Sequence, residues 1–147
     1  MFMKTHTVKK SELQERWYVI DATDRPLGRL ASEVANTLRG KHRPEFSPHL
    51  SLGDHVIIVN AEKIYLSGNK RDTKLYYHFS GYPGGLKIKS MREVIENDPT
   101  IVVRQAVRKM LPHTRLGRRM LKKLKVYTGA EHPHSAQKPQ GMPPTGY

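Results

Sequence analysis

The sequence predicts one α/β domain whose strands form a largely parallel sheet. Its length of 147 residues suits a single domain. Short runs of β-forming residues alternate along the chain with longer segments whose apolar residues recur at helical spacing. Because an alternating order of strands and helices is typical of parallel sheets, these observations favour a layered α/β fold over residues 16–128.

The first strand and the first helix are the clearest of the expected elements. A run of β-forming residues at 17–20 predicts a buried strand that ends at Asp21. Pro26 suits a first helical turn, and Gly40 ends the helix that follows. The apolar residues of this helix recur at spacings of three and four: Leu27, Leu30, Ala31, Val34 and Leu38.

The middle of the chain is expected to hold shorter elements. Residues 55–60 read HVIIVN and predict a second buried strand, and a weaker strand is expected at 64–66. A turn at 67–69 precedes strand-like sequence at 74–79. Residues 81–85 are expected to form a loop, because Pro and Gly interrupt both helices and strands.

A long helix and a further helix are expected in the last third of the domain, after a short helix at 90–97. Asp98 caps and Pro99 opens the first of them, and Pro112 ends it. Thr114 caps the second, over residues 115–123, and a short strand follows at 125–127. The apolar stripe of the first helix is expected to be Val103, Ala106, Val107, Met110 and Leu111.

Two extensions flank the predicted domain. Residues 1–15 are polar and basic and are expected to form an N-terminal arm. Residues 129–147 contain four prolines and almost no apolar side chains, which predicts an extended tail. Such a tail cannot bury enough surface to offset its ordering entropy alone.

The net charge of the chain indicates a polyanionic partner. There are 26 Lys and Arg against 13 Asp and Glu, a net charge of +13. Between Asp98 and Glu131 the chain has no acidic residue and carries nine Lys or Arg. A solvated surface usually mixes both signs, so the excess favours nucleic acid or an anionic membrane as partner.

The predicted helix at 115–123 is the strongest candidate for an RNA-binding element. Its basic residues Arg115, Arg118, Arg119 and Lys122 stand at i, i+3, i+4 and i+7 and share one face. Arg104 and Arg108 form a further i, i+4 pair on the preceding helix. Like charges arranged in this way repel, and phosphate groups, which arginine can hold with two hydrogen bonds, would compensate them.

Several weaker candidates lie elsewhere. Basic residues follow the first helix, where stabilisation of the helix end explains them as well as RNA contact does: Arg39, Lys41, His42 and Arg43. Lys70 and Arg71 occupy a turn, and Lys87 and Lys89 follow the glycine loop. Tyr82 in that loop is suited to stack on a base or a ribose, although an ordinary exposed turn explains it equally.

Other classes of function find little support. His132 and His134 flank a proline without further ligands, so contacts to RNA are favoured over a metal site. The motifs of common enzymes are absent, and no cofactor, metal or small-molecule substrate is expected.

The chain has no Cys and no apolar run of signal-peptide or membrane-spanning length, which favours a cytoplasmic protein. A membrane-surface protein, a nucleic-acid enzyme and a regulator that binds messenger RNA remain as alternatives.

Several segments, in order along the chain, resemble the bacterial family of large-subunit ribosomal protein thirteen. They include WYVIDA at 17–22, LGRLAS at 27–32, GKHRPEFSPH at 40–49, GDHVIIVNAEKI at 53–64, SGNK at 67–70, YYHFSGYPGG at 76–85, MLPHTRLGRRML at 110–121, LKVYTGAEHPH at 124–134 and SAQKPQ at 135–140. The resemblance therefore covers nearly the whole chain, from Trp17 to about Gln140. The chain departs from it at Lys109, where bacterial members usually have glycine, and in the final residues MPPTGY.

The resemblance implies a three-layer α/β/α domain with a mainly parallel sheet. It also implies a structural constituent of the large ribosomal subunit that binds ribosomal RNA, contacts neighbouring ribosomal proteins and supports early subunit assembly. By position, the RNA-contacting regions of the family correspond to Lys41–Arg43, the Lys70 turn, the loop 81–89 and the segment Arg108–Lys125. That last segment adds Lys109, Lys123 and Lys125 to the candidate residues.

Overall fold

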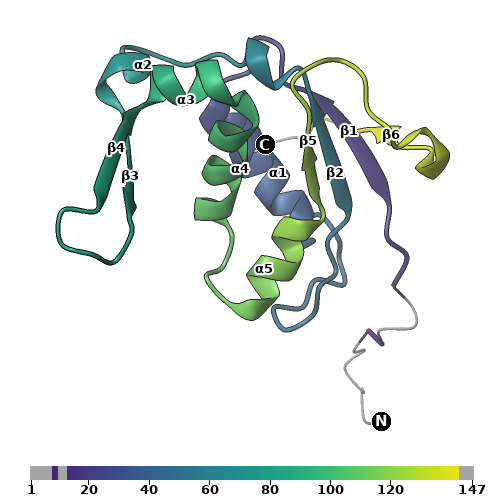
Figure 1. The fold of residues 1–147 in the computed structure, drawn as a ribbon. Helices are drawn as coiled ribbons and strands as arrows, with labels where there is room; N and C mark the ends of the chain where they lie inside the picture. The colour runs from purple at the N-terminus through teal and green to yellow at the C-terminus, as the bar shows by residue number, and fades with distance from the viewer. Residues whose placement is uncertain (1–7, 10–12, 143–147) are drawn as a thin grey trace, which may run out of the picture.

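A four-stranded parallel sheet forms the centre of the computed structural model, which describes residues 8–9 and 13–142 (Figure 1). Its strand order is β5-β2-β1-β6, and every neighbouring pair is parallel. The strands are β1 (Trp17–Asp21), β2 (His55–Val59), β5 (Leu124–Val126) and β6 (Gln140–Gly141). The predicted α/β class and the parallel sheet are therefore confirmed.

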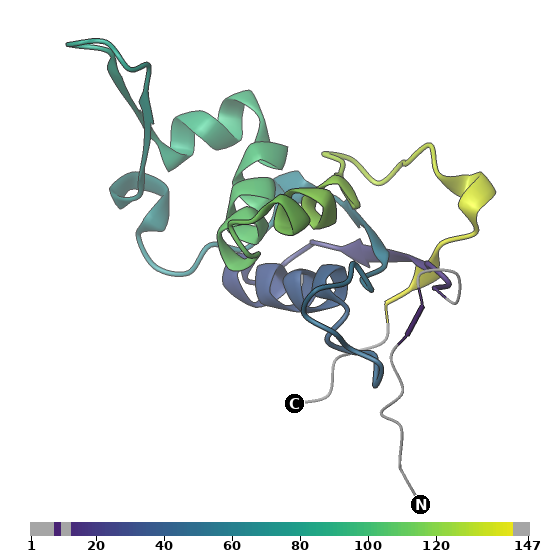
Figure 2. The same ribbon diagram turned by 90° about the horizontal axis from the view of Figure 1, so that it is seen from below.

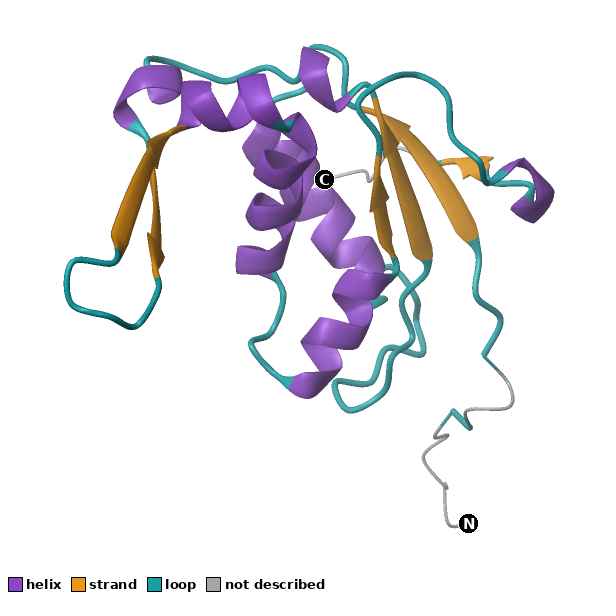
Figure 3. Ribbon diagram, in the orientation of Figure 1, coloured by secondary structure: helices purple, strands orange, loops and turns teal. Residues whose placement is uncertain are grey.

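Three helices cover one face of this sheet (Figures 2 and 3). They are α1 (Leu27–Arg39), α4 (Pro99–Met110) and α5 (Arg115–Lys122). Ile20, Val56 and Ile58 extend from the sheet into a core that they share with the helices. All five apolar residues expected on the first helix are buried there, because side chains three and four apart share one helix face.

The opposite face of the sheet carries no helical layer comparable to the first in the described residues. By alternation along β1, Trp17 and Val19 point to this side. The chain after β5 runs there through a single 3-10 turn, η3 (Ser135–Gln137), and returns as β6 (Figure 2). Of the three layers that the resemblance implies, the third is thus an irregular segment.

This irregular segment coincides with the predicted tail and is attached to the sheet. β6 pairs with β1 at Tyr18 and Val19, and the N–H of Met142 donates to the carbonyl of Val19 over 3.1 Å. Because the segment has little apolar content of its own, it is ordered by contacts with the domain, which include the packing of Met142 against the core. The last residues, 143–147, and most of the N-terminal arm, 1–7 and 10–12, lie outside the described part of the chain.

A smaller group of elements stands beside the sheet and its helices. After η2 (Ala61–Lys63) come α2 (Lys70–Thr73), the antiparallel pair β3 (Leu75–Phe79) and β4 (Leu86–Ser90), and α3 (Met91–Asn97). The β3–β4 hairpin projects away from the body of the molecule (Figure 1). Strand β4 is absent from the prediction, although Leu86 and Ile88 alternate with lysines.

Two expectations for this region were wrong. Residues 64–66 form no strand. Tyr65 makes only an isolated bridge to Pro26, because α1 begins at Leu27, directly after Pro26, and offers no further strand residues for pairing. Lys70 and Arg71 lie in the helical turn α2 and not in an irregular turn. Isolated apolar residues such as Ile64 and Leu66 are buried here without belonging to a ladder.

The predicted helix boundaries are confirmed by their capping contacts. The side chains of Ser90, Asp98 and Thr114 accept hydrogen bonds from the N–H groups of Glu93, Thr100 and Gly117. Gly40 ends α1 in the left-handed conformation, at φ 82°. One part of the expected α4 stripe was wrong: Met110 is exposed and Val102 is buried instead, since α4 packs against α3 and β5 as well as against α1.

Candidate nucleic-acid interface

Helix α5 presents its cations to solvent because its other face is anchored in the core. Met120 is buried, and Leu116 and Leu121 pack against the core with partial exposure. Gly117 is buried against the preceding turn, where a Cβ atom would overlap the carbonyl oxygen of Pro112. The four basic residues that share the other face are all exposed: Arg115, Arg118, Arg119 and Lys122.

The turn between α4 and α5 joins the basic residues of both helices. Arg108 of α4 and Arg118 of α5 line one small depression of about 120 Å³, together with His113. Arg104 is exposed one helical turn before Arg108. We call these residues the α4–α5 basic surface: Arg104, Arg108, Arg115, Arg118, Arg119 and Lys122.

The charges of the α4–α5 basic surface are not balanced from within the described residues. None of its six side chains forms a hydrogen bond or an ion pair there. The nearest acidic residues along the chain are Asp98 and Glu131, and Asp98 caps α4. Anionic groups of another molecule are therefore free to approach these cations.

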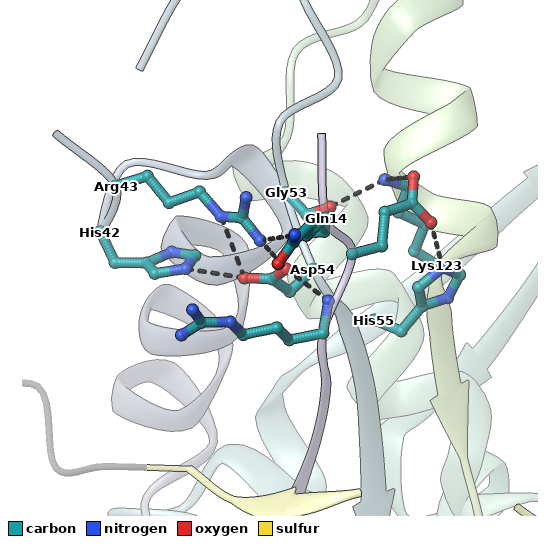
Figure 4. A network of polar contacts seen from close by, with 9 residues as sticks. Gln14, His42, Arg43, Gly53, Asp54, His55 and Lys123 are labelled. Carbon is teal, nitrogen blue, oxygen red and sulfur yellow. Dashed lines mark hydrogen bonds and ion pairs between the residues drawn. The ribbon is translucent and has the colours of Figure 1, made fainter. Parts of the chain in front are cut away.

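The basic residues at the end of α1 and just after it differ in role: some form internal contacts, and others are exposed. His42 and Arg43 both contact the carboxylate of Asp54, which is fully buried (Figure 4). His42 Nε2 lies 2.8 Å from Oδ2 of Asp54, and Arg43 reaches both carboxylate oxygens. Arg39 lies over the ring of Phe46 at 5.7 Å, whereas Lys41 is exposed.

Asp54 also fixes the chain that leads into the sheet. Its Oδ1 accepts the N–H of Arg16 over 2.8 Å, and Arg43 donates to the carbonyl of Gln14 over 2.6 Å. A buried carboxylate needs such partners, since desolvation of an unpaired charge is very costly. His42 and Arg43 therefore hold the loop before β2 and the lead-in to β1 together.

Lys123 has a similar structural role on the other side of the same strands. Its ammonium group lies 2.9 Å from a carboxylate oxygen of Glu15 and 2.7 Å from the carbonyl of Gly53 (Figure 4). His55 contacts the same carboxylate over 2.7 Å. Although burial acts to raise it, the pKa of Glu15 is lowered by the hydrogen bonds from Lys123 and His55.

The two candidate histidines lie with Lys125 in another part of the molecule, on the side of the sheet away from the helices. His134 Nε2 contacts the hydroxyl of Tyr127 over 2.8 Å, and its ring centroid lies 5.2 Å from that of Trp17. His132 Nδ1 accepts the backbone N–H of His134. Burial, and then the charge of Lys125, lowers the pKa of His134.

The projecting hairpin carries the remaining predicted residues at its tip and on β4. Tyr82 is 76% exposed in the turn, and Lys87 and Lys89 are exposed on β4. Their partners across the hairpin are His78 and Tyr76. The other face of the hairpin is apolar and exposed, a feature that sequence reasoning missed although it follows from alternation: Leu75, Tyr77, Phe79, Leu86 and Ile88.

Lys70 and Lys109 come together in a separate groove, and Arg71 is exposed beside Lys70 on α2. Two further cations, Arg29 and Lys74, line the same groove and were not among the predicted residues. They stand singly in segments of mixed character, so nothing in their local sequence marks them. Lys109 continues α4 regularly, although the family resemblance leads one to expect glycine there.

Two further findings concern other kinds of site. The described residues contain no group of three or more His, Cys, Asp or Glu side chains that could hold a metal ion. Among them, no helix combines the length and the apolar character needed to cross a membrane.

Comparison with known proteins gives consistent results. A family model described as Ribosomal protein L13 matches residues 15–133. The chain is 56% identical over 140 residues to the large ribosomal subunit protein uL13 of Aquifex aeolicus, which covers 95% of this chain and 97% of the relative. It is 58% identical over 138 residues to the protein of the same name from Beutenbergia cavernae, with 94% of each chain covered.

Proposed function

The chain belongs to the ribosomal protein L13 family, and we propose that it binds ribosomal RNA through the α4–α5 basic surface as a structural constituent of the large ribosomal subunit. It acts there, in the cytoplasmic ribosome, without a catalytic step. Its partners are ribosomal RNA and neighbouring ribosomal proteins. The observation that carries the RNA-binding surface is the gathering of six exposed cations, from two helices, without anionic partners among the described residues.

Phosphate groups fit this arrangement best. Five of the six residues are arginines, whose planar guanidinium groups can bind two phosphate oxygens at once. Capping contacts fix the two helices, and the close packing of Gly117 against Pro112 fixes the turn between them. The backbone that carries the cations is therefore already ordered before RNA binds. Contacts of this type read the shape and backbone of folded RNA more than its base edges.

Neutralisation of phosphates explains a role in assembly. RNA segments repel one another until cations reduce their charge, and a rigid basic surface can hold two of them together. We expect exposed candidates outside the α4–α5 basic surface to add RNA contacts elsewhere on the molecule: Lys41, Lys70, Arg71, Tyr82, Lys87 and Lys89. His42, Arg43 and Lys123 contribute indirectly, by fixing the loop and strand from which such contacts are made.

The salt dependence of RNA binding tests this proposal. If about eight phosphates are neutralised, log K falls with log[salt] at a slope of roughly −6 to −7, between the duplex and single-strand limits. Filter binding of the full chain to a fragment of large-subunit ribosomal RNA, across a series of salt concentrations, measures the slope. A flat response would contradict the proposal.

A further inference from the structure

A groove beside α2 is lined by four cationic side chains. It has a volume of about 830 Å³ and lies between the start of α1, α2 and the end of α4. Arg29, Lys70, Lys74 and Lys109 line it, and none of its lining residues is Asp or Glu. In a chain with 13 acidic residues, four cations in one concavity without a carboxylate indicate an anionic occupant.

The cations are close enough to affect one another. The pKa of Lys74 is lowered, first by burial and then by the charges of Lys109 and Lys70. The ammonium group of Lys74 also lies 5.5 Å from the ring centroid of Tyr76, and Lys70 contacts the hydroxyl of Ser67 over 3.1 Å. Neither contact supplies a negative charge, so the repulsion among the lysines persists.

The backbone around the groove fixes the position of these side chains. The N–H of Lys74 donates to the carbonyl of Lys70, and the carbonyl of Lys74 accepts the N–H of Met91 over 2.9 Å. On the opposite wall, the N–H of Leu27 donates to the carbonyl of Tyr65 at the start of α1. The positive end of this 13-residue helix adds to the potential of the lysines.

The groove is separate from the α4–α5 basic surface. Arg108 and Lys109 are consecutive in α4, and successive helical residues point about 100° apart. Arg108 lines the depression beside α5, whereas Lys109 lines the groove beside α1 and α2, and the two cavities share no lining residue. An RNA strand on one side of α4 therefore leaves the other side free for a second strand.

We propose that this groove binds phosphodiester groups of a second RNA segment, with Arg29 and Lys74 as its central contacts. The inference rests on the proposed function, because it takes ribosomal RNA as the source of the phosphates. The chain then holds two RNA segments on two sides of α4, and each site contributes its own share of the salt dependence.

Footprinting and salt dependence of the full chain on a large-subunit ribosomal RNA fragment test the groove. The variant R29Q/K74Q is expected to lower the magnitude of the salt slope by about two, one for each phosphate that is no longer neutralised. It is also expected to remove hydroxyl-radical protections different from those that R118A/R119A/K122A removes. The charge-preserving variant R29K/K74R is expected to keep both the slope and the protections.

A matched control removes two charges elsewhere. Lys63 and Lys138 are exposed and lie outside both basic sites, so K63Q/K138Q is expected to bind as the wild type does. If R29Q/K74Q does not fold, K109Q supplies the test, since Lys109 is exposed and its replacement is expected to lower the magnitude of the slope by about one.

The possible failures of the two proposals are distinguishable. Binding of R29Q/K74Q with the slope and protections of the wild type would overturn the groove while leaving the α4–α5 basic surface intact. Loss of the same protections as in R118A/R119A/K122A would likewise show that no separate site exists. Failure of the wild-type chain to bind the RNA would overturn the proposed function itself.

Discussion

Asp54 shows how a single acidic residue decides the role of the cations around it. It is the only acidic residue among the fully buried side chains of the described chain. By accepting from Arg16, His42 and Arg43, it converts two of the predicted RNA contacts into internal ones. The sequence offered both explanations for His42 and Arg43, and only the position of Asp54 in space separates them.

We expect Asp54→Ala to lower the free energy of unfolding by about 3–5 kcal/mol, because it leaves Arg43 partly buried without its partner. Urea denaturation of the full chain measures the change. The matched variant Asp54→Asn keeps the volume and an oxygen for the N–H of Arg16, and is expected to cost less. Equal stability of Asp54→Ala and the wild type would show that the network holds nothing together.

A pH effect is expected at His134. Its pKa is lowered in the folded chain, so the unfolded chain binds more protons below neutral pH. The contribution of His134 to stability is therefore complete above its unfolded pKa, which is ordinarily near 6.5, and is lost as the pH falls through the lower folded value.

Trp17 reports this effect, because its ring lies beside that of His134. Its fluorescence is expected to change between neutral and mildly acidic pH as the segment after β5 loosens. In His134→Gln, which does not titrate there, the change is expected to be smaller. An identical pH response in both proteins would assign the transition to another group.

At the scale of elements, every helix except the single turn α2 was predictable, because the signals of the other helices are local. Ser90, Asp98 and Thr114 cap the helices that they precede in the sequence, and Gly40 ends α1. Strand β4 and the pairing of β6 were not predicted, because neither strand forms a buried apolar run and the partner of β6, strand β1, lies near the other end of the chain. β4 is formed by a hairpin with two exposed faces, and β6 by the free edge of β1.

Helix α5 carries the clearest test at this scale. We expect R118A/R119A/K122A to keep the fold, because all three side chains are exposed and unpaired within the described chain, and to lower the magnitude of the salt slope by about three. Circular dichroism and filter binding measure the two effects. The charge-preserving R118K/R119K is expected to retain the slope, and unfolding of the triple variant would show that its cations support the core.

At the scale of the whole molecule, the sequence predicted which segments are basic better than it predicted which basic residues meet in space. The acid-free stretch from Asp98 to Glu131 identified α4 and α5 as basic, and helical spacing assigned their residues to faces. The groove was not predictable, because Arg29, Lys74 and Lys109 come from three segments. Their meeting depends on how α1, the turn α2 and α4 pack, which no local pattern encodes.

The same limit applies to the layers of the fold. Alternation of strands and helices predicted a parallel sheet, and the sheet is parallel. The side on which the helices gather depends on long-range packing: α1, α4 and α5 share one face, while the segment after β5 lies across the other (Figure 2). The exposed cations of α5 consequently lie on the helical side of the molecule.

Sedimentation of the tagged full chain on a sucrose gradient of cell lysate tests the central claim most directly. At moderate ionic strength the chain is expected to sediment with large ribosomal subunits, and R118A/R119A/K122A is expected to shift toward the top of the gradient. A wild-type chain that remains at the top, or sediments with small subunits alone, would contradict the claim that its cations are matched by the phosphates of large-subunit RNA.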